Sequence, residues 1–274
     1  MSVEFAINHM TAPQLALADF FALARKLGLT RVEIRNDIAG KAIADGTSAR
    51  EVRALAETHG VIITSINALQ QFNHWSETRH HEAQALIYYA AACGAEALVL
   101  VAANDGAVAD ASRRIADATD ALTHLAPMLR EAGLIGLVEC LGFESCSLRS
   151  KREAVAAIEA SGGADVLRLT HDTFHHHLAG ESELFPQWTG LIHISGVDDP
   201  ALAVRDMRDS HRVLVGPKDR LNNIEQIAAL RAAGYAGPVS FEPFAAELRH
   251  LADPAAAIAG SMHFITEGLK ARAA

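Results

Sequence analysis

The sequence is poor in aromatic residues and in basic charge. Only 5% of its 274 residues are Phe, Trp or Tyr, although half are hydrophobic. An apolar composition built mainly from small aliphatic side chains suits many helices packed on a buried sheet. Lys and Arg number 24 against 33 acidic residues, which gives a net charge of −9. An acidic surface argues against nucleic acid as a partner.

The hydrophobic residues form no long uninterrupted run. No apolar stretch approaches the roughly 20 residues of a membrane span, so we expect no membrane partner. The first residues, Met1-Ser-Val-Glu-Phe5, lack the basic and apolar regions of a signal peptide. Cys93, Cys140 and Cys146 are odd in number and lack paired zinc-finger spacing. This cysteine usage predicts a reducing compartment, most simply the cytoplasm.

Short apolar runs alternate with helical patterns along the whole chain. Glycines follow most of the helical patterns, as they do at helix ends. Strands that alternate with helices predict a parallel sheet, and eight such units in about 250 residues is the size of a (β/α)₈ TIM barrel. The expected strands are 3–7, 31–35, 61–66, 97–101, 134–138, 166–170, 191–195 and 239–241, and the expected helices are 11–26, 48–59, 76–92, 109–131, 150–161, 223–233 and one from residue 253 onward.

We therefore predict an α/β protein in which residues 1–274 form a single (β/α)₈ barrel domain. A doubly wound sheet is the alternative, but no G-x-G-x-x-G motif follows the first strand. Two stretches fit the barrel less simply. Residues 178–190 are short for a full crossover helix, and residues 196–222 are predicted to form a long functional loop.

The stretch His171-Asp-Thr-Phe-His-His-His177 concentrates ionisable residues after the sixth expected strand. Asp172 and His175 have D-x-x-H spacing, and on a strand that turns into a helix both can point into one cavity. A carboxylate and a neutral imidazole are ordinary ligands for Zn²⁺, Mn²⁺, Co²⁺ or Fe²⁺. The alternative is a polar loop whose histidines cap helix ends or face solvent, since a His-rich tract alone is only a compositional hint.

Other polar residues stand at the C-terminal ends of the expected strands, where the active sites of such barrels lie. Buried carboxylates are costly unless they are paired or bound to a cation. Glu139 and Glu242 each follow an apolar run, and together with Asp172 and His193 they can converge on one divalent metal from four adjacent strands. Three carboxylates and one imidazole suit Mn²⁺, Mg²⁺ or Co²⁺ as well as Zn²⁺.

Each of these strand-end residues also has a structural alternative. Glu139 can pair with Arg168, and His193 alternates with apolar neighbours, as a core histidine does. Glu33 and Arg35 can pair with neighbouring charges. For the remaining candidates the alternatives are a turn for Asn8, His9 and Asn67, a packed core for Trp75, and structural or solvent-facing positions for His171, His176 and His177.

The sequence resembles the xylose isomerase-like TIM barrels, which comprise sugar isomerases and epimerases together with the endonuclease IV branch. Four segments carry the resemblance: Leu137-Val-Glu-Cys-Leu-Gly-Phe-Glu144, His171-Asp-Thr-Phe-His175, Leu191-Ile-His-Ile-Ser195 and Gly234-Tyr-Ala-Gly-Pro-Val-Ser-Phe-Glu242. The last is the most specific, because it combines a Gly-Tyr turn with a strand that ends in Glu. The barrel pattern covers the whole chain.

The resemblance implies a site and roles for its residues. Glu139, Asp172, His193 and Glu242 would bind one divalent metal ion (Mn, Zn, Co or Mg). Glu139 and Glu242 would lie on opposite sides of the substrate and move a proton, and His175 would contact a substrate oxygen. These three residues are the expected catalytic residues.

The expected substrate contacts come from strand ends and from one loop. Arg212-Val-Leu-Val-Gly-Pro-Lys-Asp219 resembles the family's loop before the last βα unit, often Arg-x-x-x-Gly-x-Gly-x-x-Asp, but it lacks the second Gly. The full set of expected substrate contacts is His175, Asn8, His9, Arg35, Asn67, Trp75 and Arg212.

The resemblance implies a metal-dependent isomerase or epimerase of a small keto-polyol or ketose. Segment 139–144 is most similar to that of keto-inositol (inosose) isomerases and hydroxypyruvate isomerase-like enzymes, which makes 2-keto-myo-inositol one candidate substrate. The metal would polarise a carbonyl and a glutamate would remove the neighbouring proton, giving a cis-enediolate. The alternatives are a metal-dependent lyase or dehydratase acting on a 3-keto sugar or a dehydroshikimate-like substrate, an endonuclease IV-like nuclease and a noncatalytic sugar-binding barrel. A homo-oligomer is compatible with each of these functions.

Overall fold

In a computed structural model of the protein, which describes residues 3–107 and 110–273, eight strands pair in chain order and close into a barrel. All neighbouring strands are parallel, and β8 returns to pair with β1. Closure excludes the doubly wound sheet and confirms the predicted TIM barrel. The strands are β1 (Phe5–Asn8), β2 (Arg31–Arg35), β3 (Ile62–Gln70), β4 (Ala97–Val101), β5 (Ile135–Glu139), β6 (Leu167–Asp172), β7 (Thr189–Ile194) and β8 (Val239–Phe241).

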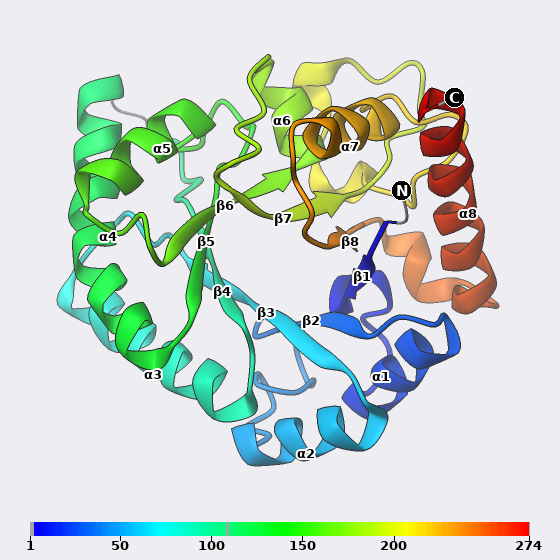
Figure 1. The fold of residues 1–274 in the computed structure, drawn as a ribbon, viewed down its shortest axis with the longest axis horizontal. Helices are drawn as coiled ribbons and strands as arrows, with labels where there is room; N and C mark the ends of the chain where they lie inside the picture. Colours follow the sequence, from blue (N-terminus) through cyan, green and yellow to red (C-terminus); the bar gives the residue numbers. More distant parts are fainter. Residues whose placement is uncertain (1–2, 108–109, 274) are drawn as a thin grey trace.

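Helices surround the barrel on its outer side (Figure 1). They are α1 (Leu17–Lys26), α2 (Ala49–His59), α3 (Glu77–Cys93), α4 (Ala111–Ala132), α5 (Lys151–Ala160), α6 (Thr173–Ala179), α7 (Asn223–Ala232) and α8 (Pro254–Ala273). Four short 3-10 turns accompany them: η1 (His9–Thr11), η2 (Val204–Asp206), η3 (Asp209–His211) and η4 (Ala246–His250). Turns η2 and η3 lie in the predicted long loop 196–222, which is otherwise irregular.

Local capping explains why α2 begins and ends where it does. Ser48 and Glu51 form a reciprocal capping box at its N-terminus. Gly60 ends the helix with a φ of 62°, a left-handed conformation that a glycine adopts without the strain other residues incur. These signals are readable in the sequence, and the predicted and observed bounds of this helix differ by one residue.

Two helices differ from the predictions. The first was expected from residue 11, but α1 begins at Leu17, because residues 9–11 form η1 and the Asn8 side chain caps it. A short helix, α6, forms within the His-rich tract, where Asp172 Oδ1 accepts the N–H groups of Phe174 and His175. This helix supplies the crossover that residues 178–190 are too short to form. Residue 109, the predicted start of the fourth helix, lies outside the described residues.

Alternate strand residues pack into two separate apolar clusters. Leu98 and Leu100 of β4 belong to the main core, which lies between the strands and the helices. Val99 belongs to a small second cluster with Leu137 and Leu191. Since successive side chains point to opposite faces of a strand, this second cluster lies inside the barrel. The interior is therefore apolar only in part, and polar residues follow at the C-terminal strand ends.

The three cysteines are buried, and none forms a disulfide. Cys93 packs in the main core. Among the described residues, no helix combines the length and the apolar composition that a membrane crossing requires.

Candidate metal centre

Four donor side chains converge at the C-terminal end of the barrel. Glu139, Asp172, His193 and Glu242 each place one ligand atom within 4.8 Å of the others, and all four are buried. They come from β5, β6, β7 and the residue that follows β8, which are neighbouring strands. The strand register places Asp172 directly beside His193. The structure thus brings together the four residues predicted to bind metal.

His193 lies at the centre of this group, with carboxylates on both edges of its ring. Its Nδ1 lies 3.1 Å from Glu139 Oε1 and 3.2 Å from Glu242 Oε2. Its Nε2 lies 3.0 Å from Glu33 Oε2. Burial alone would lower the pKa of His193, but the charges of Glu242 and Glu33 outweigh burial and hold this pKa well above its usual value. The partners of His193 are therefore carboxylates, and not the backbone groups of an ordinary core histidine.

Glu33 is a member of the cluster that the sequence reasoning left out. Its carboxylate is fully buried, and it also accepts hydrogen bonds from Ser65 Oγ at 2.5 Å and Asn67 Nδ2 at 2.9 Å. Burial would raise the pKa of Glu33, but His193 outweighs it and holds this pKa below its usual value. The alternative of pairing with a neighbouring charge holds for Glu33 in one respect, because its charged partner is His193 of the candidate metal centre. A signal for its position was available, because Glu33 stands between Val32 and Ile34, both of which pack in the outer core.

Arg35 connects the cluster with the rim of the barrel. Its Nη1 donates to Glu242 Oε1 at 2.7 Å, while Nε and Nη2 hold both carboxylate oxygens of Asp37, each at 2.7 Å. The predicted pairing with a neighbouring charge is thus present, alongside a contact to the candidate metal centre. Asn8 also donates to Glu242 Oε1, at 3.3 Å, and caps η1 with its side-chain oxygen.

Arg212 spans two of the four candidate ligands. Its Nη2 donates to Asp172 Oδ2 at 2.6 Å and to Glu242 Oε2 at 3.2 Å, and its Nε donates to Ser195 Oγ at 2.9 Å. The Phe244 ring lies 4.6 Å from its guanidinium carbon. Burial would raise the pKa of Glu242, but His193 and the two arginines outweigh it and hold this pKa far below its usual value. Arg212 therefore lies directly against two of the four candidate ligands.

The donor set fits a divalent cation by charge and by chemistry. Burial, together with the charges of Glu242 and Asp172, raises the pKa of Glu139 above its usual value, although His193 acts in the opposite direction. The positive groups around the site, Arg35, Arg212 and His193, therefore do not supply enough positive charge to stabilise the ionised form of the Glu139 carboxyl group. A divalent ion would supply that positive charge, and oxygen donors with one imidazole are suitable ligands for Mn²⁺, Co²⁺, Zn²⁺ or Mg²⁺. The cluster holds four carboxyl groups (Glu33, Glu139, Asp172, Glu242) and three basic groups (Arg35, His193, Arg212).

His175 lies next to the four donors, on the first turn of α6. Its Nδ1 accepts the backbone N–H of Gly142 at 3.2 Å, which places the ring proton on Nε2. The Phe143 ring packs edge-on against it, with the centroids 5.2 Å apart. The D-x-x-H spacing brings both residues to one place because Asp172 caps the helix that carries His175. The orientation leaves Nε2–H available as a hydrogen-bond donor.

Two predicted substrate contacts lie among other side chains. His9 Nε2 bonds to Leu15 O at 3.1 Å, and its ring stacks on Phe20 at 4.4 Å. Trp75 stacks on His124 of α4, with the ring centroids 5.1 Å apart. None of these described contacts includes a member of the cluster, so they correspond to the structural alternatives. Asn67, in contrast, reaches the cluster through Glu33.

The remaining histidines of the tract lie outside the four-donor group. His171 Nε2 bonds to Gln226 at 2.8 Å, and His176 Nδ1 lies 2.6 Å from Lys151 Nζ. Burial lowers the pKa of His176 to about 4, with Lys151 acting in the same direction. These contacts match the structural roles expected for both residues.

Comparison with known proteins gives one family. The chain matches the sequence profile of the xylose isomerase-like TIM barrel family over residues 21–267. A xylose isomerase domain-containing protein from Salmonella typhimurium LT2 is 31% identical, with a TM-score of 0.87 and both chains covered over 100% of their length. No protein of curated function matches the sequence.

Two further solved structures share the fold at lower identity. The IolI protein, whose structure holds a zinc atom, is 20% identical with a TM-score of 0.85, covering 98% of this chain and 99% of its own. An L-ribulose 3-epimerase is 20% identical with a TM-score of 0.74, covering 98% of this chain and 95% of its own. These two likenesses show the fold alone.

Proposed function

The chain belongs to the xylose isomerase-like TIM barrel family, and we propose that it is a divalent-metal-dependent isomerase or epimerase of a small ketose or keto-polyol. The observation that carries this proposal is the convergence of Glu139, Asp172, His193 and Glu242 at the strand ends where barrel enzymes have their active sites. The zinc atom of IolI and the epimerase activity in the name of the second relative support the same chemistry. 2-Keto-myo-inositol remains one candidate substrate.

The four residues would hold the ion, and Glu33 would orient one of them. A divalent cation bound there would act as a Lewis acid that polarises the substrate carbonyl and makes the neighbouring C–H more acidic. Glu33 fixes the His193 ring through Nε2, so that Nδ1 faces Glu139 and Glu242. With a divalent ion bound, a histidine held in this way would keep its ring proton on Nε2 and offer Nδ1 to the ion.

Glu139 and Glu242 would move the proton. They extend from opposite ends of the four-strand arc, and each lies about 3 Å from His193 Nδ1. One of them removes the proton from the carbon next to the carbonyl, which gives a cis-enediolate. The same group or the other returns the proton to the neighbouring carbon. General-base catalysis of this kind requires an ionised carboxylate within hydrogen-bond reach of the proton.

His175 would stabilise the charge that develops on the substrate oxygen. Its Nδ1 is engaged by the N–H of Gly142, so Nε2 presents a proton in a fixed direction. A donor that is already oriented stabilises developing negative charge without reorganisation. Arg212, which already donates to Asp172 and Glu242, would contact the same end of the substrate.

Solvent exchange of the substrate α-proton tests the proposal. Ketoses and keto-polyols are incubated in D₂O with Mn²⁺, Co²⁺, Zn²⁺ or Mg²⁺, and deuterium next to the carbonyl is followed by NMR. Glu139→Gln and Glu242→Gln should each abolish the exchange while the barrel stays folded. Glu96→Gln is the matched control, because Glu96 lies before β4, at the opposite end of the barrel. Full exchange in both active-site variants would contradict the proposed roles.

Product analysis separates the proposed reaction from its alternatives. An isomerase or epimerase retains every substrate atom except the exchanged hydrogen, whereas a lyase or dehydratase releases water or an aglycone. If no substrate exchanges and no divalent ion changes the melting temperature, the noncatalytic sugar-binding barrel is the better description.

A further inference from the structure

A cavity of about 630 Å³ lies beside the candidate metal centre, between the β5–α5 loop, α6 and the β7–α7 segment. We call it the mouth cavity. Two contacts link its lining with the site. The Phe143 ring packs on His175, and Asp209 accepts a hydrogen bond at 3.1 Å from Arg212, which also binds Asp172. Its volume falls within the roughly 300–1,000 Å³ of small-molecule sites. The mouth cavity is therefore placed to receive the part of a substrate that extends away from the reacting carbons.

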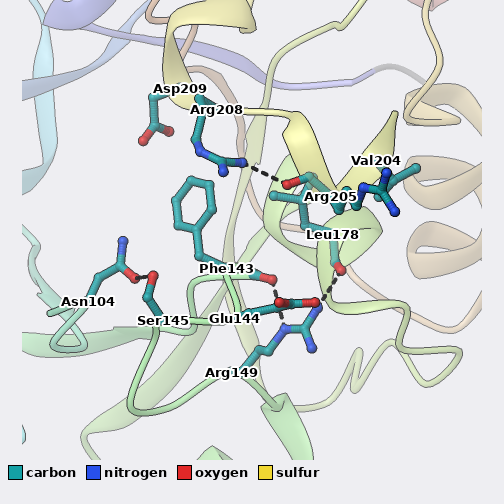
Figure 2. A pocket seen from close by; sticks show the side chains of 11 residues that line it. Asn104, Phe143, Glu144, Ser145, Arg149, Leu178, Val204, Arg205, Arg208 and Asp209 are labelled. Carbon is teal, nitrogen blue, oxygen red and sulfur yellow. Dashed lines mark hydrogen bonds between the residues drawn. The ribbon is translucent and has the colours of Figure 1, made fainter. Parts of the chain in front are cut away.

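Three arginines line the mouth cavity. Figure 2 shows Arg149, from the β5–α5 loop, on one side of Phe143, and Arg205 and Arg208, from the β7–α7 segment, on the other. The chain as a whole carries a net charge of −9. Three guanidinium groups around one cavity therefore form a local concentration of positive charge on an acidic protein.

Two of these guanidinium groups are held by backbone carbonyls. Arg149 donates from Nε to Gly142 O and from Nη2 to Leu178 O, both at 2.8 Å. Arg208 donates from Nη1 to Arg205 O at 2.8 Å and to Met207 O at 2.7 Å. Carbonyl oxygens fix the direction of a guanidinium group without neutralising its charge. Each arginine keeps further N–H donors for a ligand.

The acidic residues of the lining do not cancel this charge. Glu144 and Asp209 also line the mouth cavity, so three arginines face two carboxylates and leave a net charge of +1. Asp209 is engaged by Arg212. Arg205 lies 3.9 Å from Asp206, whereas neither Arg149 nor Arg208 belongs to an ion pair identified in the described part of the chain. Guanidinium groups that are oriented but not paired with a carboxylate can bind the carboxylate or phosphate group of a ligand through paired hydrogen bonds.

We propose that the substrate is a sugar acid or a sugar phosphate, whose anionic group binds in the mouth cavity between Arg149 and Arg208. This inference rests on the proposed function, because it assumes that the reacting carbons lie at the candidate metal centre. Binding of a group that does not itself react positions the carbonyl and the adjacent C–H for proton transfer. An uncharged ketose lacks this anchor.

Matched substrates test the inference. For each ketose that shows exchange in D₂O, kcat/KM is compared for the uncharged sugar, its terminal carboxylate and its terminal phosphate. We expect kcat/KM of the preferred anionic form to exceed that of the uncharged sugar by about 10–100-fold. This factor corresponds to the free energy of a hydrogen bond to a charged group. Arg208→Gln should lower kcat/KM for the anionic form much more than for the uncharged sugar, and so remove most of this preference. Arg53→Gln, on the exposed surface of α2, is the matched control.

Equal kcat/KM for the charged and uncharged forms would overturn the inference while leaving the proposed isomerase intact. A binding experiment keeps the two separable if no substrate exchanges. Glycerol, glycerate and glycerol phosphate are titrated calorimetrically into the wild type and into Arg208→Gln. We expect one of the two anions to bind the wild type at least about tenfold more tightly than the variant, and glycerol to show no difference. The anion that binds distinguishes a sugar acid from a sugar phosphate, and equal binding to both proteins would overturn the inference.

Discussion

The carboxylate of Glu33 lies 3.0 Å from Nε2 of His193, on the edge of the ring opposite the candidate metal ligands. Glu33 comes from β2 and His193 from β7, so barrel closure brings them together across the interior. In metal sites, a histidine ligand commonly donates its second ring N–H to a carboxylate, which fixes the tautomer and the ring orientation. The same two residues therefore define which nitrogen of His193 would face an ion.

Replacing Glu33 by glutamine should weaken metal binding. The amide keeps the size of the side chain, but it is no longer a charged acceptor for His193 Nε2. Loss of such an outer partner lowers metal affinity by about 10–100-fold. Calorimetric titration of the chelator-treated protein with Mn²⁺ or Zn²⁺ measures this change, with Glu96→Gln as the control. Equal affinity in Glu33→Gln and the wild type would show that Glu33 does not position the ligand.

Arg212 should matter most when no ion is present. Removing one partner of a buried ion pair costs about 3–5 kcal/mol, because the remaining charge is left buried and unpaired. Arg212→Gln should therefore lower the free energy of unfolding by this amount in the presence of a chelator, and Mn²⁺ should restore part of it. Arg31→Gln, which removes pairs with the half-exposed Glu4 and Glu96, should cost less than about 1 kcal/mol. Urea denaturation measures both, and equal losses in both variants would contradict the account.

The close approach of Gly142 to α6 should be required for catalysis but not for metal binding. A Cβ atom at Gly142 would lie 2.2 Å from His175 O, so Gly142→Ala must displace the β5–α5 loop and break its bond to His175 Nδ1. We expect the exchange rate to fall about 10–100-fold, as displacement of a catalytic group does, with unchanged metal affinity. Gly260→Ala is the control, because a Cβ there has no neighbour within 4 Å. An unchanged exchange rate in Gly142→Ala would exclude a catalytic role for the orientation of His175.

His9 should make the stability of the barrel depend on pH. Burial lowers its pKa from 6.5 to about 4, although the bond to Leu15 O opposes this. Between these two pKa values the imidazole of residue 9 binds more protons in the unfolded chain than in the folded chain. The contribution of His9 to the free energy of unfolding is therefore complete above pH 6.5 and is lost as the pH falls towards 4. From pH 7 to pH 5 the loss is roughly 2 kcal/mol.

Urea denaturation at pH 7 and pH 5, with a chelator present, measures this dependence. His9→Gln should reduce the loss of stability by roughly 2 kcal/mol. Phe20→Leu, which removes the ring that stacks on His9, should lower stability at both pH values but keep the pH dependence. An unchanged pH dependence in His9→Gln would assign the titration to other groups.

The strands and the four donors could be predicted from the sequence, because each signal is local. Glu139 and Glu242 follow apolar runs directly, and Asp172 with His175 forms a short spaced pair. In parallel barrels the strand ends meet at one edge, so position along the strand alone locates these side chains. The direction in which the neighbouring residues point could not be predicted in the same way.

The remaining side chains could not be placed from the sequence, as three residues show: Glu33, His9 and Trp75. Glu33 and Arg35 have the spacing of a surface ion pair, and only barrel closure shows that both point inward against His193 and Glu242. His9 and Trp75 follow strand ends but turn towards Phe20 and His124, because rings of helices α1 and α4 lie beside them. Such contacts between distant segments depend on tertiary packing, which spacing along the chain does not specify.

We propose that Glu139, Asp172, His193 and Glu242 together hold one divalent ion. Anomalous diffraction from crystals of the protein soaked in Mn²⁺ tests it most directly, with Glu242→Gln as the comparison. We expect one strong anomalous peak within coordination distance of all four side chains, and we expect it to be weakened or lost in the variant. A peak elsewhere in the barrel, or equal occupancy in both proteins, would contradict the claim.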